Sequence, residues 1–487
     1  MNEEILNLQP AAVWAQFREL LGIPRPSGKE GKVTEFVRAF GESLGLHTIV
    51  DEVGNVIIRK PATPGMENRM GVVLQGHLDM VPQKNSGIPH QFDTDPIRAR
   101  IDGEWVKATD TTLGADNGMG VAAAMAVLAS GSLRHGPVEG LFTVDEESGM
   151  TGAFNLKPGL LEGDILMNLD SEDEGELYVG CAGGTNANIA MAYGQEAVPA
   201  DYQAFNLIIK GLKGGHSGLD IHLGRGNANK LVFRYLKHAA REHGLRIASY
   251  EGGNLRNAIP REAFALVVVA AAQAEALQKC VEKFASVYQS ELSVTEPELY
   301  FGIEPAARPE YMMEATAQKA ITHAIIACPN GVIRMSDTMP GLVETSTNLS
   351  IVKISDGKVA IQCLMRSSVD SAREDLGEMI HSAFSLAGAD VTFDGSYPGW
   401  KPNPASPILN VMKEVYGKHF GRVPEIKAIH AGLECGLLGG VYPHWDMISF
   451  GPTIRYPHSP DEKVHIPSVA KFWDFLVKTL ENIPEKK

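Results

Sequence analysis

The stretch VVLQGHLDM, residues 72–80, decides the fold of the first part of this 487-residue chain. Its β-branched and apolar residues predict a buried strand, which gives way to polar side chains at His77 and Asp79. Open α/β sheets place their ligand sites at the carboxyl ends of strands. Residues two apart on an extended backbone point the same way, so His77 can bind a metal while Asp79 orients it from behind.

Acidic residues follow other predicted strands or begin a predicted helix. They are Asp116 before an Ala-rich helix over 121–129, Glu146 and Glu147 after a strand over 138–144, and Asp170 after a strand over 165–169. Taken singly, Asp116 is better explained as a helix N-cap, the commonest role of an Asp at a helix start, and the Glu pair as a solvated acidic turn. Together they indicate one site at a sheet edge, because crowded carboxylates repel one another unless a cation lies between them.

The composition excludes several classes of protein. The formal net charge is −15 without any basic stripe, so we expect no nucleic-acid partner. The amino terminus lacks a secretory signal, and the longest apolar run, 263–272, is far shorter than the roughly 20 residues of a membrane span. Five dispersed cysteines are typical of reduced thiols, so we expect a cytoplasmic protein without a membrane partner.

Turn and helix signals divide the chain further. Ser27 and Glu30 have the spacing of a capping box and predict a helix over 28–44. Gly54-Asn55 and Asp356-Gly357 are typical of hairpin turns.

The order of the predicted elements indicates two domains. From about residue 186 the α/β pattern gives way to two successive β/α units, and it returns after the Pro-rich segment 397–407. We therefore expect a discontinuous catalytic domain, residues 1–185 and 397–487, with residues 186–396 inserted.

The residues at the predicted sheet edge have the composition of a metal site. They are His77, Asp116, Glu147, Asp170 and, from the last part of the chain, His458. Two imidazoles and three carboxylates suit a pair of divalent ions, most often zinc, although cobalt or manganese also fits these ligands. With Asp116 as the bridge, each ion has one His, one terminal carboxylate and a shared water, which leaves a position for substrate.

The order of these motifs resembles the co-catalytic zinc aminoacylase/carboxypeptidase family of metallopeptidases. Within it, the chain is most similar to the bacterial aminoacyl-histidine (cytosolic non-specific, β-alanyl-histidine) dipeptidases. The motifs that carry the resemblance are Gly76–Asp79, Gly114–Gly118, Glu146-Glu147, Asp170, Leu212–Gly218, Leu255–Phe264, His430–Gly436 and His458–Glu462. The resemblance covers essentially the whole chain, and no motif position departs from the pattern.

The resemblance implies a fold and a metal centre. The fold is α/β, a dinuclear-zinc peptidase domain with an inserted α+β lid domain of two ferredoxin-like halves, through which a homodimer forms. The two zinc ions of each subunit are held by two sets of ligands that share Asp116, namely His77 with Asp170 and Glu147 with His458. The family often has a cis peptide after the bridging Asp, here Asp116-Asn117.

The resemblance also implies a reaction, the hydrolysis of dipeptides with free termini. Its specificity is broad and includes Xaa-His dipeptides such as β-alanyl-histidine. Asp79 orients His77, Glu146 is the general base and then the acid as the metal-bridged water attacks, and His216 donates to the oxyanion. N-acyl amino acid amidohydrolases and aminotripeptidases of the same family remain alternatives, as does a non-catalytic peptide-binding protein.

A dipeptidase must also bind the two charged ends of its substrate. Arg366 can pair with the free carboxylate, and Asn257 can add a donor. Arg366 is otherwise explained as a surface ion pair. Glu434 can bind the substrate ammonium, and a helix-start carboxylate explains it equally well.

Overall fold

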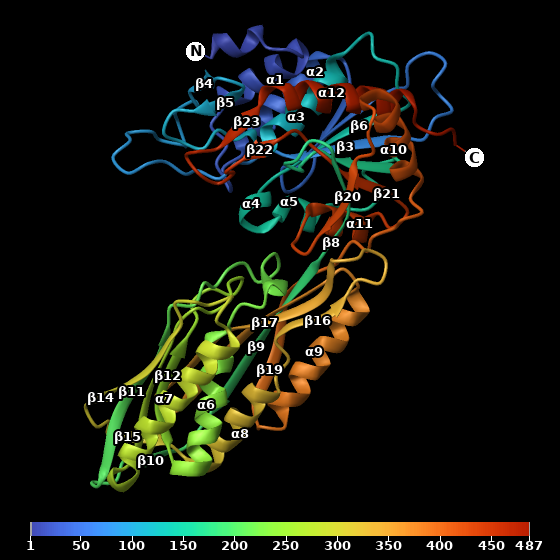
Figure 1. Ribbon diagram of the computed structural model, residues 1–487. Coiled ribbons are helices and arrows are strands. Elements are labelled where there is room, and N and C mark those ends of the chain that lie inside the picture. Colours follow the sequence, from blue (N-terminus) through green and yellow to red (C-terminus); the bar gives the residue numbers. More distant parts are fainter. Residues whose placement is uncertain (1, 487) are drawn as a thin grey trace. The chain divides into compact units, whose positions relative to one another are not determined.

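The computed structural model describes residues 2–486, which form two compact units (Figure 1). Unit 1 comprises the chain through Cys181, Pro402–Ala428 and the chain from Leu433 onward, and unit 2 comprises Ala182–Lys401 and Ile429–Gly432. Both units combine helices with sheets, which confirms the predicted α/β class. Among the described residues, every helix is too short or too polar to span a lipid bilayer.

Unit 1 is organised around an eight-stranded sheet of order β1-β2-β6-β3-β7-β21-β8-β20. Its four consecutive strands β6, β3, β7 and β21 run parallel. Their carboxyl ends therefore lie along one edge. The strands are β1 (His47–Val50), β2 (Val56–Lys60), β3 (Val72–His77), β6 (Val138–Thr143), β7 (Ile165–Asn168), β8 (Glu176–Cys181), β20 (Glu425–Ile429) and β21 (Asp446–Ser449).

A second, four-stranded sheet and several helices complete unit 1. The strands are β4 (Ala99–Asp102), β5 (Trp105–Ala108), β22 (Ile454–Arg455) and β23 (Lys463–His465). The helices are α1 (Ala11–Leu21), α2 (Gly31–Ser43), α3 (Ala115–Ala129), α4 (Glu146–Gly149), α5 (Thr151–Asn155), α10 (Pro407–Phe420), α11 (Glu434–Val441), α12 (Ile466–Glu481) and the short 3-10 helix Glu3–Asn7.

The predicted strand over 72–80 is confirmed as β3, which is buried along its whole length. Helix α3 packs directly on it. This close approach requires small residues, because a Cβ at Gly76 would lie 2.3 Å from Asn117 Oδ1, and one at Gly120 would lie 2.3 Å from the Leu169 carbonyl. The Ala- and Gly-rich sequence of α3 thus brings the start of the helix against the end of β3.

Unit 2 is built on one nine-stranded sheet, of order β14-β11-β13-β12-β17-β18-β9-β19 with β16 beside β17. The antiparallel pairing of β12 with β17 joins two four-stranded halves into one continuous sheet. Its four long helices lie along one face of the sheet and bury a common core (Figure 1).

In unit 2, runs of two or three strands are separated by helices, and a single strand follows the last helix. The strands are β9 (Gly183–Ala192), β10 (Gln195–Ala197), β11 (Tyr202–Lys210), β12 (Arg246–Gly252), β13 (Ala263–Ala270), β14 (Tyr300–Ala306), β15 (Tyr311–Met313), β16 (Gly331–Met335), β17 (Val343–Ser355), β18 (Lys358–Ser367) and β19 (Asp390–Tyr397). The helices are α6 (Ala228–His243), α7 (Ala274–Glu291), α8 (Ala315–Ala327), α9 (Asp370–Ser385) and the 3-10 helices Ile221–Leu223 and Ala271–Gln273.

The local predictions had different outcomes. The hairpin turn at Asp356-Gly357 is confirmed, with both residues at positive φ between β17 and β18. The capping box at the start of α2 is wrong, because Glu30 is the N-cap residue without a side-chain cap bond. The Ser27 hydroxyl donates instead to Asp79 Oδ2 at 2.8 Å, a long-range partner that local spacing cannot reveal.

Candidate metal centre

Neighbouring parallel strands of unit 1 carry the predicted ligands to one sheet edge. Strand β3 ends at His77, α4 places Glu147 shortly after β6, and Asp170 follows β7 by two residues. Because β6 and β7 flank β3 in parallel pairing, these three side chains start from the same edge. Helix α3 adds Asp116 from its first turn.

The first group of potential ligands consists of His77, Asp116 and Asp170, whose nearest ligand atoms all lie within 4.8 Å of one another. His77 Nε2 lies 3.2 Å from Asp116 Oδ1 and 3.3 Å from Asp170 Oδ1. The imidazole is fully buried, and both carboxylates are nearly so. A cation at the centre of this group would have one nitrogen and two oxygen ligands.

The second group consists of Asp116, Glu147 and His458. His458 Nε2 lies 3.3 Å from Asp116 Oδ2 and 2.9 Å from Glu147 Oε2. The two groups therefore share Asp116, with one carboxylate oxygen facing each imidazole. This is the arrangement that a bridging carboxylate between two cations requires.

The residues present fit a pair of divalent cations. Glu147 Oε1 is buried and accepts no hydrogen bond from the residues described, so this side chain has an unused ligand atom. Burial raises the pKa of Asp170 to about 7, and the carboxylates of Asp116 and Glu147 raise the pKa of His458 to about 11. Burial is the main cause of the Asp170 shift, with the neighbouring Asp116 charge adding to it, and the shift of His458 comes from its two carboxylate partners. Divalent cations bound among these side chains would favour the ionised carboxylates and the neutral imidazole.

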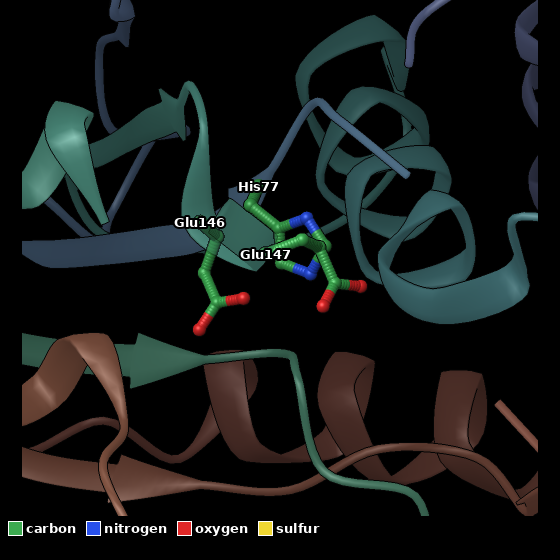
Figure 2. Close-up of side chains that lie close together, drawn as sticks. All are labelled: His77, Glu146 and Glu147. Carbon is green, nitrogen blue, oxygen red and sulfur yellow. The ribbon is translucent and has the colours of Figure 1, made fainter. Parts of the chain in front are cut away.

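Glu146 belongs to a third group, together with His77 and Glu147. In Figure 2 the carboxylates of both glutamates extend to the same side, and that of Glu147 lies beside the His77 ring. Burial raises the pKa of Glu146 well above its ordinary value, and the nearby carboxylates add to this effect. A carboxyl group with a raised pKa can accept a proton and return it at neutral pH.

Asp79 is completely buried behind His77. Its Oδ1 lies 3.3 Å from His77 Nδ1, and its two oxygens accept the backbone N–H groups of Glu146 and Glu147 at 3.0 and 3.2 Å. Burial opposes ionisation, but the hydrogen bonds from His77 and Ser27 outweigh it and lower the pKa of Asp79 to about 2. An ionised Asp79 thus orients both the imidazole and the backbone of the Glu pair.

The start of α3 differs from a simple capped helix. The N-cap residue is Gly114, at φ 71°, and the Asp116 side chain forms no cap bond. The peptide bond between Asp116 and Asn117 is cis, and Asn117 Nδ2 donates to the Leu169 carbonyl at 2.7 Å. The alternative interpretation of Asp116 as an N-cap is therefore wrong.

A comparison of the sequence with known families agrees with this geometry. The sequence profile of peptidase family M20/M25/M40 matches residues 73–482, which include every residue of the three groups. The chain belongs to the M20/M25/M40 peptidase family. The resemblance inferred from the motifs is thereby confirmed.

Relatives in the M20/M25/M40 family match the chain over its full length. The cytosol non-specific dipeptidase of Escherichia coli strain K12 is 48% identical over 99% of this chain and 100% of the relative. The crystal structure of aminoacylhistidine dipeptidase from Vibrio alginolyticus is 49% identical, with a TM-score of 0.95 and coverage of 100% and 99%. Aminopeptidase PepT from Bacillus cereus, 18% identical over 98% of this chain and 99% of that one, has a TM-score of 0.57 and shares the fold.

Glu434 lies in unit 1 of this M20/M25/M40 peptidase, at the first position of α11. Its Oε2 accepts hydrogen bonds from Gln75 Nε2 at 2.6 Å and Thr143 Oγ1 at 2.8 Å, whereas Oε1 is buried and accepts none from the described residues. Burial raises the pKa of Glu434 to about 7. Both interpretations of Glu434 therefore stay open: the residue lies at a helix start, and its Oε1 has no hydrogen-bond donor among the described residues.

Unit 2 holds the predicted substrate-binding residues His216, Arg366 and Asn257. Arg366 is 6% exposed, and no carboxylate of the described chain lies within ion-pair distance of it, so the surface ion pair is wrong. Its Nη2 lies 3.5 Å from His216 Nε2, and its Nη1 donates to the Tyr397 hydroxyl at 3.4 Å. Asn257 is exposed, and its backbone carbonyl accepts the Ser217 N–H at 2.8 Å.

The tautomer of His216 follows from its backbone contacts. Nδ1 accepts the N–H groups of Gly218 and Leu219 at 3.2 and 3.0 Å, so the ring proton is on Nε2. Burial and the nearby Arg366 lower the pKa of His216, which keeps the ring neutral. His216 therefore presents a single N–H donor at Nε2.

Two buried charged residues of unit 1, Arg25 and Glu462, were not among the predicted site residues. Both contact the segments that carry the ligands. Glu462 lies in the quoted His458 motif, and Arg25 stands between two prolines that break any helical or strand pattern. These two sequence features could have drawn attention to Glu462 and Arg25, but neither feature indicates which groups the side chains bind.

Proposed function

We propose that this chain is a metal-dependent dipeptidase that hydrolyses dipeptides with free termini, Xaa-His dipeptides such as β-alanyl-histidine among them. The observation that carries the proposal is the pair of ligand groups that share Asp116. The names of the relatives from E. coli and V. alginolyticus support the dipeptide as the substrate class.

Two divalent cations per subunit are part of the proposal. His77 and Asp170 would hold one, Glu147 and His458 the other, and Asp116 would bridge them. Zinc suits this mixture of imidazoles and carboxylates, and cobalt or manganese are acceptable substitutes. Bound there, the pair would lower the pKa of a water molecule to near neutrality and polarise the scissile carbonyl.

Glu146 would move the proton of the reaction. Its carboxylate takes a proton from the attacking water and then donates it to the leaving amine, so one residue serves as base and acid. Asp79 supports this role, because its Oδ1 accepts the backbone N–H of Glu146 and so fixes the position of the Glu146 backbone.

The residues of unit 2 would recognise the rest of the substrate. The Nε2–H of His216 suits an oxyanion donor, and the Arg366 guanidinium suits a terminal carboxylate, with Asn257 as an additional donor. The free oxygen of Glu434 suits a substrate ammonium. We further propose a cytoplasmic location, which the name of the E. coli relative supports, and a homodimer through unit 2, which analytical ultracentrifugation will test.

A substrate panel tests the proposed function. We expect the metal-loaded protein to release histidine from β-alanyl-histidine, and a chelator to abolish this release until Zn²⁺ is restored. N-acetylated dipeptides and tripeptides should react poorly. Preferential cleavage of acylated amino acids or tripeptides would favour the alternative amidohydrolase or aminotripeptidase, and no cleavage of any dipeptide by metal-loaded protein would contradict the proposal.

Substitution of Arg366 by lysine should impair recognition of the carboxylate. Lysine keeps the charge but loses the planar pair of donors, so we expect KM for a free dipeptide to rise about 10- to 100-fold with a smaller change in kcat. The preference for a dipeptide over its carboxamide should shrink in parallel.

The matched control for this variant is Arg246→Lys. Arg246 also lies largely buried in unit 2, where it pairs with Glu196 at 2.9 Å. We expect its substitution to leave KM unchanged. An undiminished preference for the free acid in Arg366→Lys would remove Arg366 from its proposed role.

A further inference from the structure

Two buried charges beside the metal centre take no part in the chemistry proposed above. Arg25 and Glu462 are each 2% exposed, and in the part of the chain described no salt bridge joins them directly, although burial lowers the pKa of Arg25 and the charge of Glu462 opposes this shift. Burial of an unpaired charge costs several kcal/mol unless hydrogen bonds compensate. Their hydrogen-bond partners should therefore reveal what these residues do.

Glu462 binds the backbone of the turn that leads into α3. Its Oε2 accepts the N–H groups of Leu113 and Gly114 at 2.8 and 3.0 Å. Its Oε1 accepts those of Ala115 and Asp116 at 2.7 and 3.2 Å. One carboxylate thus accepts four successive N–H groups of the segment that leads into α3, among them the unpaired N–H groups at the start of the helix. The last of them belongs to the proposed bridging residue.

Arg25 binds the same turn from its carbonyl side and joins it to the end of β3. Nη1 donates to the carbonyls of Leu78 and Asp79 at 2.9 and 3.0 Å, and Nη2 donates to that of Gly114 at 2.5 Å. A Cβ at Gly114 or Gly118 would lie 2.6 or 2.7 Å from Nη2. The two glycines that enclose Ala115–Asn117 therefore leave room for the guanidinium.

We propose that Arg25 and Glu462 are positioning residues, a clamp on the 113–116 turn that holds Asp116 between the two imidazoles. Asp116 lies 3.2 Å from His77 Nε2 and 3.3 Å from His458 Nε2, so a small shift of the turn would disturb both ligand groups. Glu462 also anchors the segment that carries His458, four residues earlier. The clamp acts only through backbone groups, and the inference rests on the proposed metal centre.

A structural role and a positioning role differ in what they predict for metal binding. Glu139 provides the comparison, because it is also buried, accepts the N–H groups of Glu162 and Gly163 at 2.8 Å each, and pairs with Arg59. Glu139 lies near the amino end of β6, whereas the proposed metal ligand Glu147 follows the carboxyl end of this strand. Loss of its charge should weaken the fold without moving any proposed ligand.

The test compares Glu462→Gln with Glu139→Gln in full-length, metal-free protein. Zn²⁺ affinity is measured by competition with a chromogenic chelator, and thermal unfolding is recorded on the same samples. We expect both variants to unfold at lower temperature, but only Glu462→Gln to bind Zn²⁺ about 10- to 100-fold more weakly. Wild-type affinity in Glu462→Gln, or an equal loss in Glu139→Gln, would overturn the clamp.

Arg25→Lys is the second variant, in case Glu462→Gln does not fold. Lysine keeps the buried charge but cannot reach three carbonyls with a planar fork. We expect Zn²⁺ affinity to fall at least about 10-fold. Wild-type affinity in this variant would also refute the clamp. If the wild-type protein itself bound no Zn²⁺, the proposed metal centre would fail rather than the clamp.

Discussion

Replacement of Glu146 by glutamine should lower kcat by about 10³–10⁴-fold, the upper part of the range that a positioned acid–base group contributes. The amide keeps the size of the side chain but cannot take a proton from water or return one to the leaving amine. Because Glu146 belongs to neither of the two groups that share Asp116, metal content should stay unchanged. Steady-state kinetics and elemental analysis of the purified variant check both parts.

The control for Glu146 is Glu162→Gln, which removes an exposed carboxylate paired with Arg59 in the same unit. This variant should retain wild-type kcat and metal content. Unchanged turnover in Glu146→Gln would contradict its proposed role. Loss of turnover together with loss of metal would instead make Glu146 a ligand, as its grouping with His77 and Glu147 allows.

Asp116→Asn should have an equally large effect through a different cause. An amide has one uncharged oxygen ligand in place of two anionic ones, so it cannot bridge two cations. We expect metal content to fall to no more than about half of the wild-type value, with turnover lost. Elemental analysis after gel filtration, with activity measured in excess Zn²⁺, checks this.

Asp164→Asn is the matched control for the bridging residue. Asp164 accepts the Gly71 N–H at 2.7 Å and lies just before β7, at the end of that strand away from Asp170. Its substitution should change neither metal content nor turnover. Full metal content in Asp116→Asn would show that Asp116 does not bridge.

The sequence allowed prediction of the candidate ligands because their position follows from the strand pattern. An apolar strand that ends in His77, and parallel neighbours that end near Glu147 and Asp170, need only the rule that such ends meet at one edge. For these residues, the side-chain type itself carries the information. The bridging role of Asp116, by contrast, was implied by the family resemblance and not by the strand pattern.

The remaining features depend on partners that a side-chain pattern does not specify. Arg25 and Glu462 bind backbone groups, which every residue possesses, so no motif pairs them with the 113–116 turn. Ser27 has a hydroxyl that fits a local capping box, but burial of Asp79 makes the distant carboxylate the partner. The domain boundary also depends on distant contacts. The short segment Ile429–Gly432 belongs to unit 2, although the chain before and after it belongs to unit 1.

Anomalous diffraction at the zinc absorption edge, from crystals of the metal-loaded protein, tests the central claim most directly. Two peaks about 3.5–4 Å apart, each in contact with one oxygen of Asp116, are the predicted result. One ligand shell should contain His77 and Asp170, and the other Glu147 and His458. A single peak, or two peaks with Asp116 outside coordination distance of either, would contradict the account.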